Sequence, residues 1–376
     1  MKYFQRQMLL LLPGVTLLSL LVYLSDGPKR LFGRPDSTAG EPAAACRPQV
    51  NIGFLKTHKC ASTTIQNILF RFGLRHNLTF VLPLTGNYLG RREPFNAELV
   101  RDLPWHALGY NILAVHNRWD HAQVARVMPA NTTYVTALRD PAAAFQSMYA
   151  YLEQDRVEPL SAFLEREPIP EERFFGVLGR NQMLWDLGLP ADRLTDFAAV
   201  RRLVADTERR FRLVMIAERL DESLVLLKHA LCWRIEDVVG LRLNSRTAAA
   251  HSALPRRARV RLKRWLAADY LLYSHFLALF ERRVAEFGAA RMRREVAELR
   301  AVNERALERC DMESSERATM QPDFATFSER VYGFQPRTHS EWCDSLARPE
   351  LQFVDLLRKR QLRMAQGQGL LFNSTT

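Results

Sequence analysis

Residues 50–72 read VNIGFLKTHKCASTTIQNILFRF and predict a strand, a turn and a helix in that order. The run over 50–55 is apolar, and the later apolar residues recur at the spacing of one helix face. A helix N-terminus presents unpaired backbone N–H groups and partial positive charge, so an anion can bind there. The turn also carries lysines and hydroxyl side chains suited to a phosphate or sulfate: Lys56, Thr57, Lys59, Ser62, Thr63 and Thr64.

An ordinary Ser/Thr-capped loop with solvated lysines is the alternative interpretation of this turn. The order of strand, turn and helix favours the anion site. A Walker A loop needs Gly-x4-Gly-Lys-[Ser/Thr], whereas no glycine occurs between Lys56 and Thr64. An ATP-type site is therefore disfavoured.

A second candidate anion site follows an apolar strand predicted over 133–138. Asp140 is suited to the N-cap of the next helix, and Pro141 to its first position. Ser147 falls two helical turns later on the same face, so Arg139 and Ser147 could bind one phosphate together. The alternative pairs Arg139 with Asp140 and leaves Ser147 exposed, and spacing alone does not decide between the two.

A third strand is predicted over 111–115 and ends at His116. Ligands of open α/β sheets gather beyond the carboxyl ends of the strands, so His116 is a candidate base, although a lone histidine is more often structural. The preceding stretch, 80–104, is predicted to be irregular. A further buried strand over 211–217 ends at Glu218, which we expect to satisfy loop amides or a cap rather than bind magnesium.

The N-terminal region predicts a membrane anchor. Residues 8–24 carry no charge, are just long enough to span a bilayer, and follow Lys2 and Arg6. A poor cleavage site favours a retained anchor over a signal peptide. We therefore predict the following organisation: cytoplasmic tail 1–7, transmembrane signal anchor 8–24, stem 25–48 and luminal domain 49–376.

The net charge indicates which partners the protein could bind, and the sequons and cysteines indicate its cellular compartment. The formal net charge of +12 favours anionic partners such as nucleotide phosphates, acidic glycans or a membrane surface. Without an aromatic-rich RNA signature or zinc-spaced cysteines, no nucleic-acid partner is expected. Sequons at Asn77, Asn131 and Asn373 support a luminal location. Cys60 is the odd thiol inside the turn, and three pairings are open to the other cysteines, Cys46, Cys232, Cys310 and Cys343.

Several segments together resemble the Golgi galactose-3-O-sulfotransferases. Residues 56–64 with 67–72 look like the 5′-phosphosulfate loop of that family, and 138–141 with Ser147 are similar to its 3′-phosphate motif. The resemblance extends over most of residues 51–353 and includes three further segments, 211–227, 242–246 and 349–352.

This resemblance implies an α/β, P-loop-like sulfotransferase fold, with a central parallel sheet flanked by helices, on a type II Golgi anchor. The implied reaction transfers a sulfuryl group from 3′-phosphoadenosine 5′-phosphosulfate (PAPS) to the 3-hydroxyl of a terminal β-galactose on glycoprotein or glycolipid glycans, without a metal. Within the family, the likeness is nearest to members that act on glycoprotein-type β-galactosides rather than on galactosylceramide.

The resemblance also implies roles for single residues. His116 would be the general base, with His58 as the alternative, and Lys59 or Lys56 would neutralise charge on the transferring group. Arg139 and Ser147 would hold the 3′-phosphate. The 5′-phosphosulfate would be held by the residues of the turn, Lys56, Thr57, Lys59, Ser62, Thr63 and Thr64.

The sequence departs from the family pattern at two places. Cys60 stands where relatives carry Thr or a similar small residue, and Ala114 and Val115 replace a more polar lead-in to His116. Two other functions stay open: a sulfotransferase for a uronyl or hexosamine acceptor, and an inactive relative that binds PAPS or glycans. The oligomeric state is also open, with a homodimer as one candidate.

Overall fold

The computed structural model describes residues 46–171, 179–241, 243, 254–315, 319–329 and 331–370. The predicted tail and anchor and nearly all of the stem lie outside these ranges, as do 244–246 and the sequon at Asn373. Within these ranges no helix has the length and apolar character needed to cross a membrane. Residues from Arg47 onward form one compact unit.

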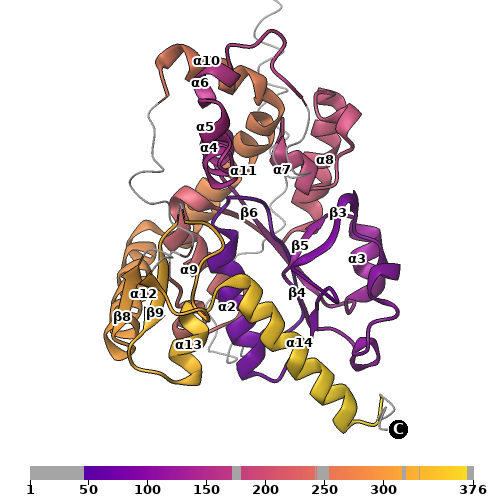
Figure 1. The fold of residues 1–376 in the computed structure, drawn as a ribbon, viewed down its shortest axis with the longest axis vertical. Coiled ribbons are helices and arrows are strands. Elements are labelled where there is room, and N and C mark those ends of the chain that lie inside the picture. Colours follow the sequence, from indigo (N-terminus) through magenta and orange to yellow (C-terminus); the bar gives the residue numbers. More distant parts are fainter. Residues whose placement is uncertain are drawn as a thin grey trace, which may run out of the picture. The chain divides into compact units, whose positions relative to one another are not determined.

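A parallel sheet lies at the centre of this unit (Figure 1). Its described strands are all parallel to their neighbours, and their order is β2 (Phe80–Val81), β4 (Ile112–Leu113), β1 (Ile52–Leu55), β6 (Thr133–Leu138) and β7 (Leu213–Ile216). Gly53 lies in central β1, where a Cβ atom would come within 2.5 Å of the Tyr134 ring on β6. The strand therefore needs glycine for close packing.

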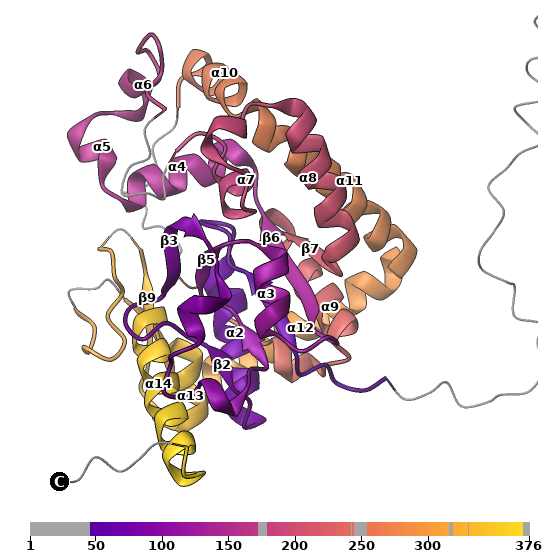
Figure 2. The ribbon, with the colours of Figure 1, turned by 90° about the vertical axis from the view of Figure 1, so that its right-hand side faces the viewer.

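Helices flank the sheet (Figures 1 and 2). Helix α12 packs on α9, α13 and α14 pack on α2, and α11 contacts both β7 and α8. The bounds of these helices are α2 Ser62–Arg75, α8 Phe197–Arg210, α9 Leu220–Leu231, α11 Ala267–Phe287, α12 Ala289–Arg309, α13 Glu341–Ala347 and α14 Glu350–Gly367. The predicted α/β fold with a central parallel sheet flanked by helices is confirmed.

A second apolar cluster lies beside α4 (Pro141–Tyr151), which starts at the carboxyl end of β6. Phe145 from α4, Phe163 from α6 (Leu160–Phe163) and Trp265 from α10 (Arg256–Trp265) meet in it. These helices lie together at the top of Figure 1. The remaining described α-helices are α3 His121–Val127, α5 Gln154–Val157 and α7 Gln182–Asp186.

Local sequence signals predicted some elements and missed others. Strand β6 has the predicted bounds, and Asp140 caps α4 by accepting a hydrogen bond from the Ala143 N–H. The prediction that 80–104 is irregular is wrong, because β2 and β3 (Tyr88–Pro94) lie in it. The strand predicted over 111–115 is also wrong in extent. Strand β4 ends at Leu113, and β5 (His116–Arg118) pairs with β3 in a separate small sheet.

Disulfides tie the C-terminal region together. Cys310 at the end of α12 is bonded to Cys343 in α13, and between them lies an antiparallel pair, β8 (Met312–Ser315) and β9 (Gly333–Pro336). Cys46 and Cys232 are also disulfide-bonded. The odd thiol is Cys60, which is free and fully buried. Burial raises the pKa of this thiol, so it stays protonated.

Candidate active site

The loop between β1 and α2 is a turn without glycine, where the sequence predicts an anion site. Lys59 and Ala61 adopt left-handed backbone conformations, with φ of 58° and 57°, where glycine is normally found. The N–H groups of Cys60, Ala61 and Ser62 have no hydrogen-bond acceptor among the described residues. Successive N–H groups in such a turn, at the start of a helix, form a concave site for an anion.

The hydroxyl groups of this loop are used to fix its shape. Thr57 donates to the carbonyl of Ala137 in β6, and the Ser62 hydroxyl donates to the carbonyl of Thr57 at 2.7 Å. The Thr64 hydroxyl donates to the carbonyl of Leu241 at 2.8 Å. These three hydroxyl protons are therefore engaged within the protein, whereas the backbone N–H groups of the turn remain as donors for an anion. The predicted contacts of these side chains with the 5′-phosphosulfate stay predictions, as does that of Thr63.

Lys56 joins two distant parts of the chain at the end of β1. Its Nζ lies 2.5 Å from Glu350 Oε2, at the start of α14, and 2.8 Å from His116 Nε2. Gln66 also donates to Glu350, at 3.1 Å. Burial lowers the pKa of the Lys56 ammonium, and the Glu350 carboxylate opposes that shift. The carboxylate therefore favours a charged lysine in this buried place.

His116 is enclosed on several sides. Its ring stacks 4.4 Å from the His58 ring and 4.7 Å from the Tyr88 ring, and its Nδ1 is buried without a hydrogen-bond partner. Burial holds the pKa of His116 well below its ordinary value, and the neighbouring Lys56 and His58 lower it further. His116 is thus a neutral imidazole whose Nε2 contacts Lys56.

His58 is held by a different set of partners. Its Nδ1 lies 2.9 Å from Asp186 Oδ1, at the end of α7, and its backbone N–H donates to Asp186 Oδ2 at 2.8 Å. Its Nε2 lies 3.0 Å from the Tyr88 hydroxyl. His58 and His116 therefore belong to one cluster but have separate hydrogen-bond networks.

Arg139 connects the second predicted anion site to the first. Its guanidinium donates to the Lys59 carbonyl at 3.1 Å and lies 3.9 Å from Glu218, so it does not form the alternative pair with Asp140. Glu218 accepts from the Asp140 N–H at 2.9 Å, which confirms that it satisfies a loop amide. Ser147 is buried on α4 rather than exposed. Lys59 Nζ lies 4.0 Å from the centre of the Tyr151 ring.

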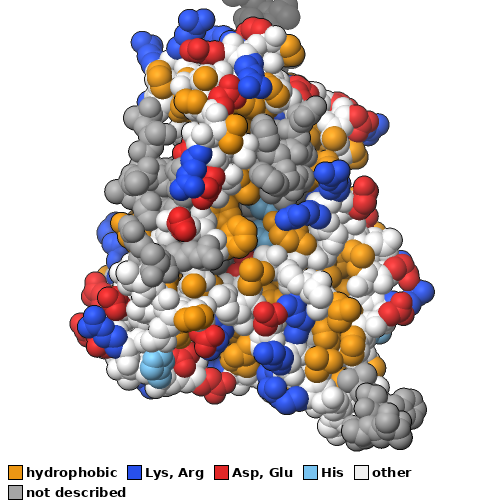
Figure 3. Space-filling model, in the orientation of Figure 1, with side chains coloured by type: hydrophobic (Ala, Val, Ile, Leu, Met, Phe, Trp, Pro, Cys, Tyr) orange, Lys and Arg blue, Asp and Glu red, His pale blue; other side chains and the backbone are white. Residues whose placement is uncertain are grey.

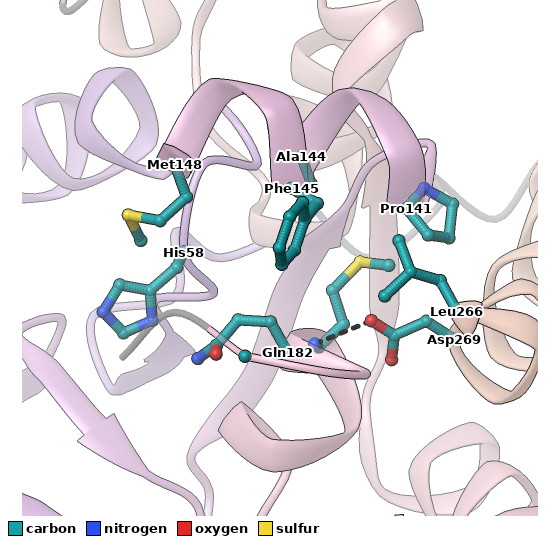
Figure 4. Close-up of a pocket in the computed structure, with 10 residues that line it drawn as sticks. His58, Pro141, Ala144, Phe145, Met148, Gln182, Leu266 and Asp269 are labelled. Carbon is teal, nitrogen blue, oxygen red and sulfur yellow. Dashed lines mark hydrogen bonds between the residues drawn. The ribbon is translucent and has the colours of Figure 1, made fainter. Parts of the chain in front are cut away.

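A small cavity lies behind His58, between α4 and α7 (Figure 4). Phe145 and Met148 line it from α4, and Gln182 lines it from α7. Its volume is about 10 Å³, which is room for a single water molecule. Figure 3 shows histidine atoms near the middle of this face, between hydrophobic side chains.

Comparison with known proteins identifies the family of this chain. The family model described as galactose-3-O-sulfotransferase matches residues 1–361. The chain belongs to the galactose-3-O-sulfotransferase family. It is 38% identical to galactose-3-O-sulfotransferase 3 of Bos taurus, over 96% of this chain and 91% of that protein. It is 41% identical to galactose-3-O-sulfotransferase 2 of Homo sapiens, over 80% of this chain and 76% of that protein.

The relatives of this chain also include a protein that is named for a glycolipid acceptor. The chain is 36% identical to galactosylceramide sulfotransferase of Bos taurus, over 85% of this chain and 80% of that protein. The similarity therefore does not distinguish a glycoprotein acceptor from a glycolipid acceptor. In the described part of the chain, no group of three or more His, Cys, Asp and Glu residues is placed to hold a metal ion.

Sequence reasoning missed several residues of the site. Glu350 lies in the segment 349–352, which was part of the family resemblance but had no role assigned to it. Tyr88 lies in the stretch predicted to be irregular. Asp186 ends a short helix, and no local pattern marks it. The pairing of Lys56 with Glu350 spans 294 positions, so only the folded chain shows it.

Proposed function

We propose that this galactose sulfotransferase transfers a sulfuryl group from PAPS to the 3-hydroxyl of a terminal β-galactose, without a metal. One observation carries the proposal: a buried lysine and two histidines lie beside an N–H nest at the start of α2. The N–H groups and the lysine can bind an anionic sulfuryl donor, and a histidine beside them can accept the proton of the acceptor hydroxyl.

The site for the PAPS donor is proposed to extend from the carboxyl end of β1 to the carboxyl end of β6. The nest at Cys60, Ala61 and Ser62 suits the 5′-phosphosulfate, because the unpaired N–H groups supply hydrogen bonds to oxygen anions. Arg139 and Ser147 are proposed to hold the 3′-phosphate. The bond from Arg139 to the Lys59 carbonyl supports this role, since it keeps the guanidinium beside the nest.

Side chains of the site are proposed to act on both the leaving group and the acceptor hydroxyl. As the acceptor oxygen attacks sulfur, negative charge grows on the oxygen that bridges sulfur and phosphate. The Lys56 ammonium, with Lys59 as the second cation, is proposed to neutralise it. The acceptor proton is proposed to leave through one of the two histidines. Family resemblance favours His116 for that role, and His58 is the alternative.

An acceptor panel tests the proposed activity. Purified luminal domain is incubated with radiolabelled PAPS and N-acetyllactosamine glycans, galactosylceramide or heparan. We expect label at the 3-hydroxyl of galactose, with the glycoprotein-type acceptor preferred. Incorporation into heparan but not lactosamine would show a uronyl or hexosamine sulfotransferase instead. Retention on PAPS-agarose with no turnover on any acceptor would show an inactive relative.

A type II Golgi location is proposed from residues 8–24 and from the membership of the family. The luminal orientation predicts that N-glycans attach at Asn77 or Asn131 and that a C-terminal tag is protected from protease in sealed microsomes. Tag digestion without detergent would contradict it. The homodimer is tested separately, by light scattering of the luminal domain.

A further inference from the structure

The two histidines of the cluster are not equivalent as proton acceptors. Lys56 lies against His116 Nε2 and, when charged, donates its proton there. Nδ1 then carries the proton of the neutral ring, and this atom is buried. His116 therefore has no nitrogen that is both basic and open to a substrate. The geometry instead suits it to position the Lys56 ammonium.

The partners of His58 leave the opposite nitrogen basic. The Asp186 carboxylate accepts from the His58 backbone N–H and lies within 3.0 Å of Nδ1 through both oxygens, so Nδ1 carries a proton. Gln182 donates to the same carboxylate at 2.8 Å. Because Nδ1 is the donor, Nε2 has the free electron pair, and the Tyr88 hydroxyl at 3.0 Å donates to it.

Tyr88 lies at the edge of this network. It is partly exposed, whereas Asp186 is 1% exposed. Burial raises the pKa of Tyr88, and the carboxylates of Glu350 and Asp186 raise it further. The phenol therefore stays protonated and can pass a proton on without ionising first. Its oxygen keeps lone pairs that can accept a hydrogen bond from a sugar hydroxyl.

We propose that Tyr88 and His58 carry the acceptor proton away, and that Asp186 is the positioning residue that fixes the tautomer of His58. This inference rests on the proposed function. As the acceptor oxygen bonds to sulfur, its proton passes to the Tyr88 oxygen and the Tyr88 proton passes to His58 Nε2. The bond from sulfur to the bridging oxygen breaks, and adenosine 3′,5′-diphosphate leaves with the electron pair.

The test compares Asp186→Asn and Tyr88→Phe with the wild-type luminal domain. An asparagine amide can donate to Nδ1 and so favours the wrong tautomer, and phenylalanine removes the relay hydroxyl. We expect kcat to fall by about 10²- to 10⁴-fold in each, with KM for PAPS within about threefold. The Asp186→Glu variant should recover part of the lost kcat.

A pH profile and a proton inventory separate chemistry from structure. The titratable groups in contact with His58 are Asp186 from α7, Tyr88 from β3 and His116 from β5. Beyond His116 lie Lys56 and its partner Glu350. We expect the acidic limb of kcat/KM to move in Asp186→Asn. In mixtures of H₂O and D₂O, a plot of kcat against the D₂O fraction should be curved for the wild type, because two protons move. The plot should be linear for Tyr88→Phe, because only one proton moves.

Two controls match these changes. Asp269 is buried and accepts from the Met183 and Leu184 N–H groups at the start of α7, whereas Asp186 accepts from His58. Asp269→Asn should lower stability without moving the acidic limb. Tyr110→Phe removes a buried hydroxyl elsewhere and should keep kcat. If the wild type sulfates galactose while Tyr88→Phe and Asp186→Asn keep its kcat and pH profile, the inference is wrong. If the wild type sulfates no galactoside, the proposed function is wrong, and the inference that rests on it is wrong as well.

Discussion

The loops that follow β1 and β6 face the same edge of the sheet but are built differently. The β1 loop is mostly buried and places two non-glycine residues in left-handed conformations. The β6 loop has an ordinary start, with Asp140 as N-cap and Pro141 at the first helical position, and Arg139 is 28% exposed. The first loop holds its groups in one arrangement, whereas the second presents a long, adjustable side chain.

This difference teaches how one site can combine chemistry and nucleotide binding. Buried groups fixed by several hydrogen bonds can act on a developing charge without rearrangement. Arg139 is partly exposed, so its removal is expected to reduce ligand affinity and to leave the fold intact. Changes to the β1 loop should therefore alter both turnover and stability, and changes to Arg139 should alter ligand affinity.

The largest effect is expected from Lys56→Met, which removes the buried ammonium and leaves Glu350 unpaired. We expect kcat to fall by about 10³-fold or more, since the cation that we propose to act on the transferring group is lost. Urea unfolding should also show a stability loss of about 3 kcal/mol. The double variant with Glu350→Gln should regain stability but not kcat. Activity within tenfold of wild type would show that Lys56 has no chemical role.

The next effect concerns Arg139→Ala at the β6 loop. Calorimetry should show affinity for adenosine 3′,5′-diphosphate reduced by about 10- to 100-fold, because charge-assisted hydrogen bonds are lost. Affinity for 5′-AMP should change far less, and the melting temperature should stay close to that of the wild type. Equal loss for both nucleotides would reject a 3′-phosphate role for Arg139.

A smaller effect is the pH dependence of stability on the β1 side. His116 is held neutral in the folded protein, because its pKa is depressed by burial and by Lys56. In the unfolded chain it takes up a proton below about pH 6.5. Unfolding then binds a proton, so stability falls as pH falls, by up to about 1.4 kcal/mol per pH unit.

Unfolding curves at pH 7.5, 6.5 and 5.5 check this dependence. His116→Gln should flatten the decline, because glutamine does not titrate. Arg139→Ala should keep the wild-type slope, which would locate the pH sensitivity in the β1 cluster. An unchanged slope in His116→Gln would show that the pH dependence of stability comes from other groups.

The smallest effect compares two alanines. Ala61→Gly should relieve a left-handed conformation that costs about 1–2 kcal/mol in a non-glycine residue. The greater freedom of glycine in the unfolded chain offsets up to about 1 kcal/mol of that gain. We expect a net stabilisation of up to about 1 kcal/mol. Ala142→Gly, in the regular first turn of α4, should destabilise by about 0.5–1 kcal/mol, and a loss of the same size at Ala61 would contradict the strain argument.

Much of the frame around the site could be predicted because its signals are local. A short apolar run marked β6, and Asp140 followed by Pro141 marked the start of α4. The extent of β4 and the presence of β3 could not be predicted. Strand β3 pairs with β5 across more than twenty residues, and its exposed arginines give it no apolar alternation.

The sequence by itself determined the strand, turn and helix of residues 50–72, the absence of glycine in the turn, and the family to which the chain belongs. Tertiary structure decided how the turn works. Packing placed Glu350 against Lys56 and Asp186 against His58, which are 294 and 128 positions apart. Periodicity and capping record the neighbours of a residue along the chain, whereas the charge of Lys56 and the tautomer of His58 depend on groups that only folding brings near.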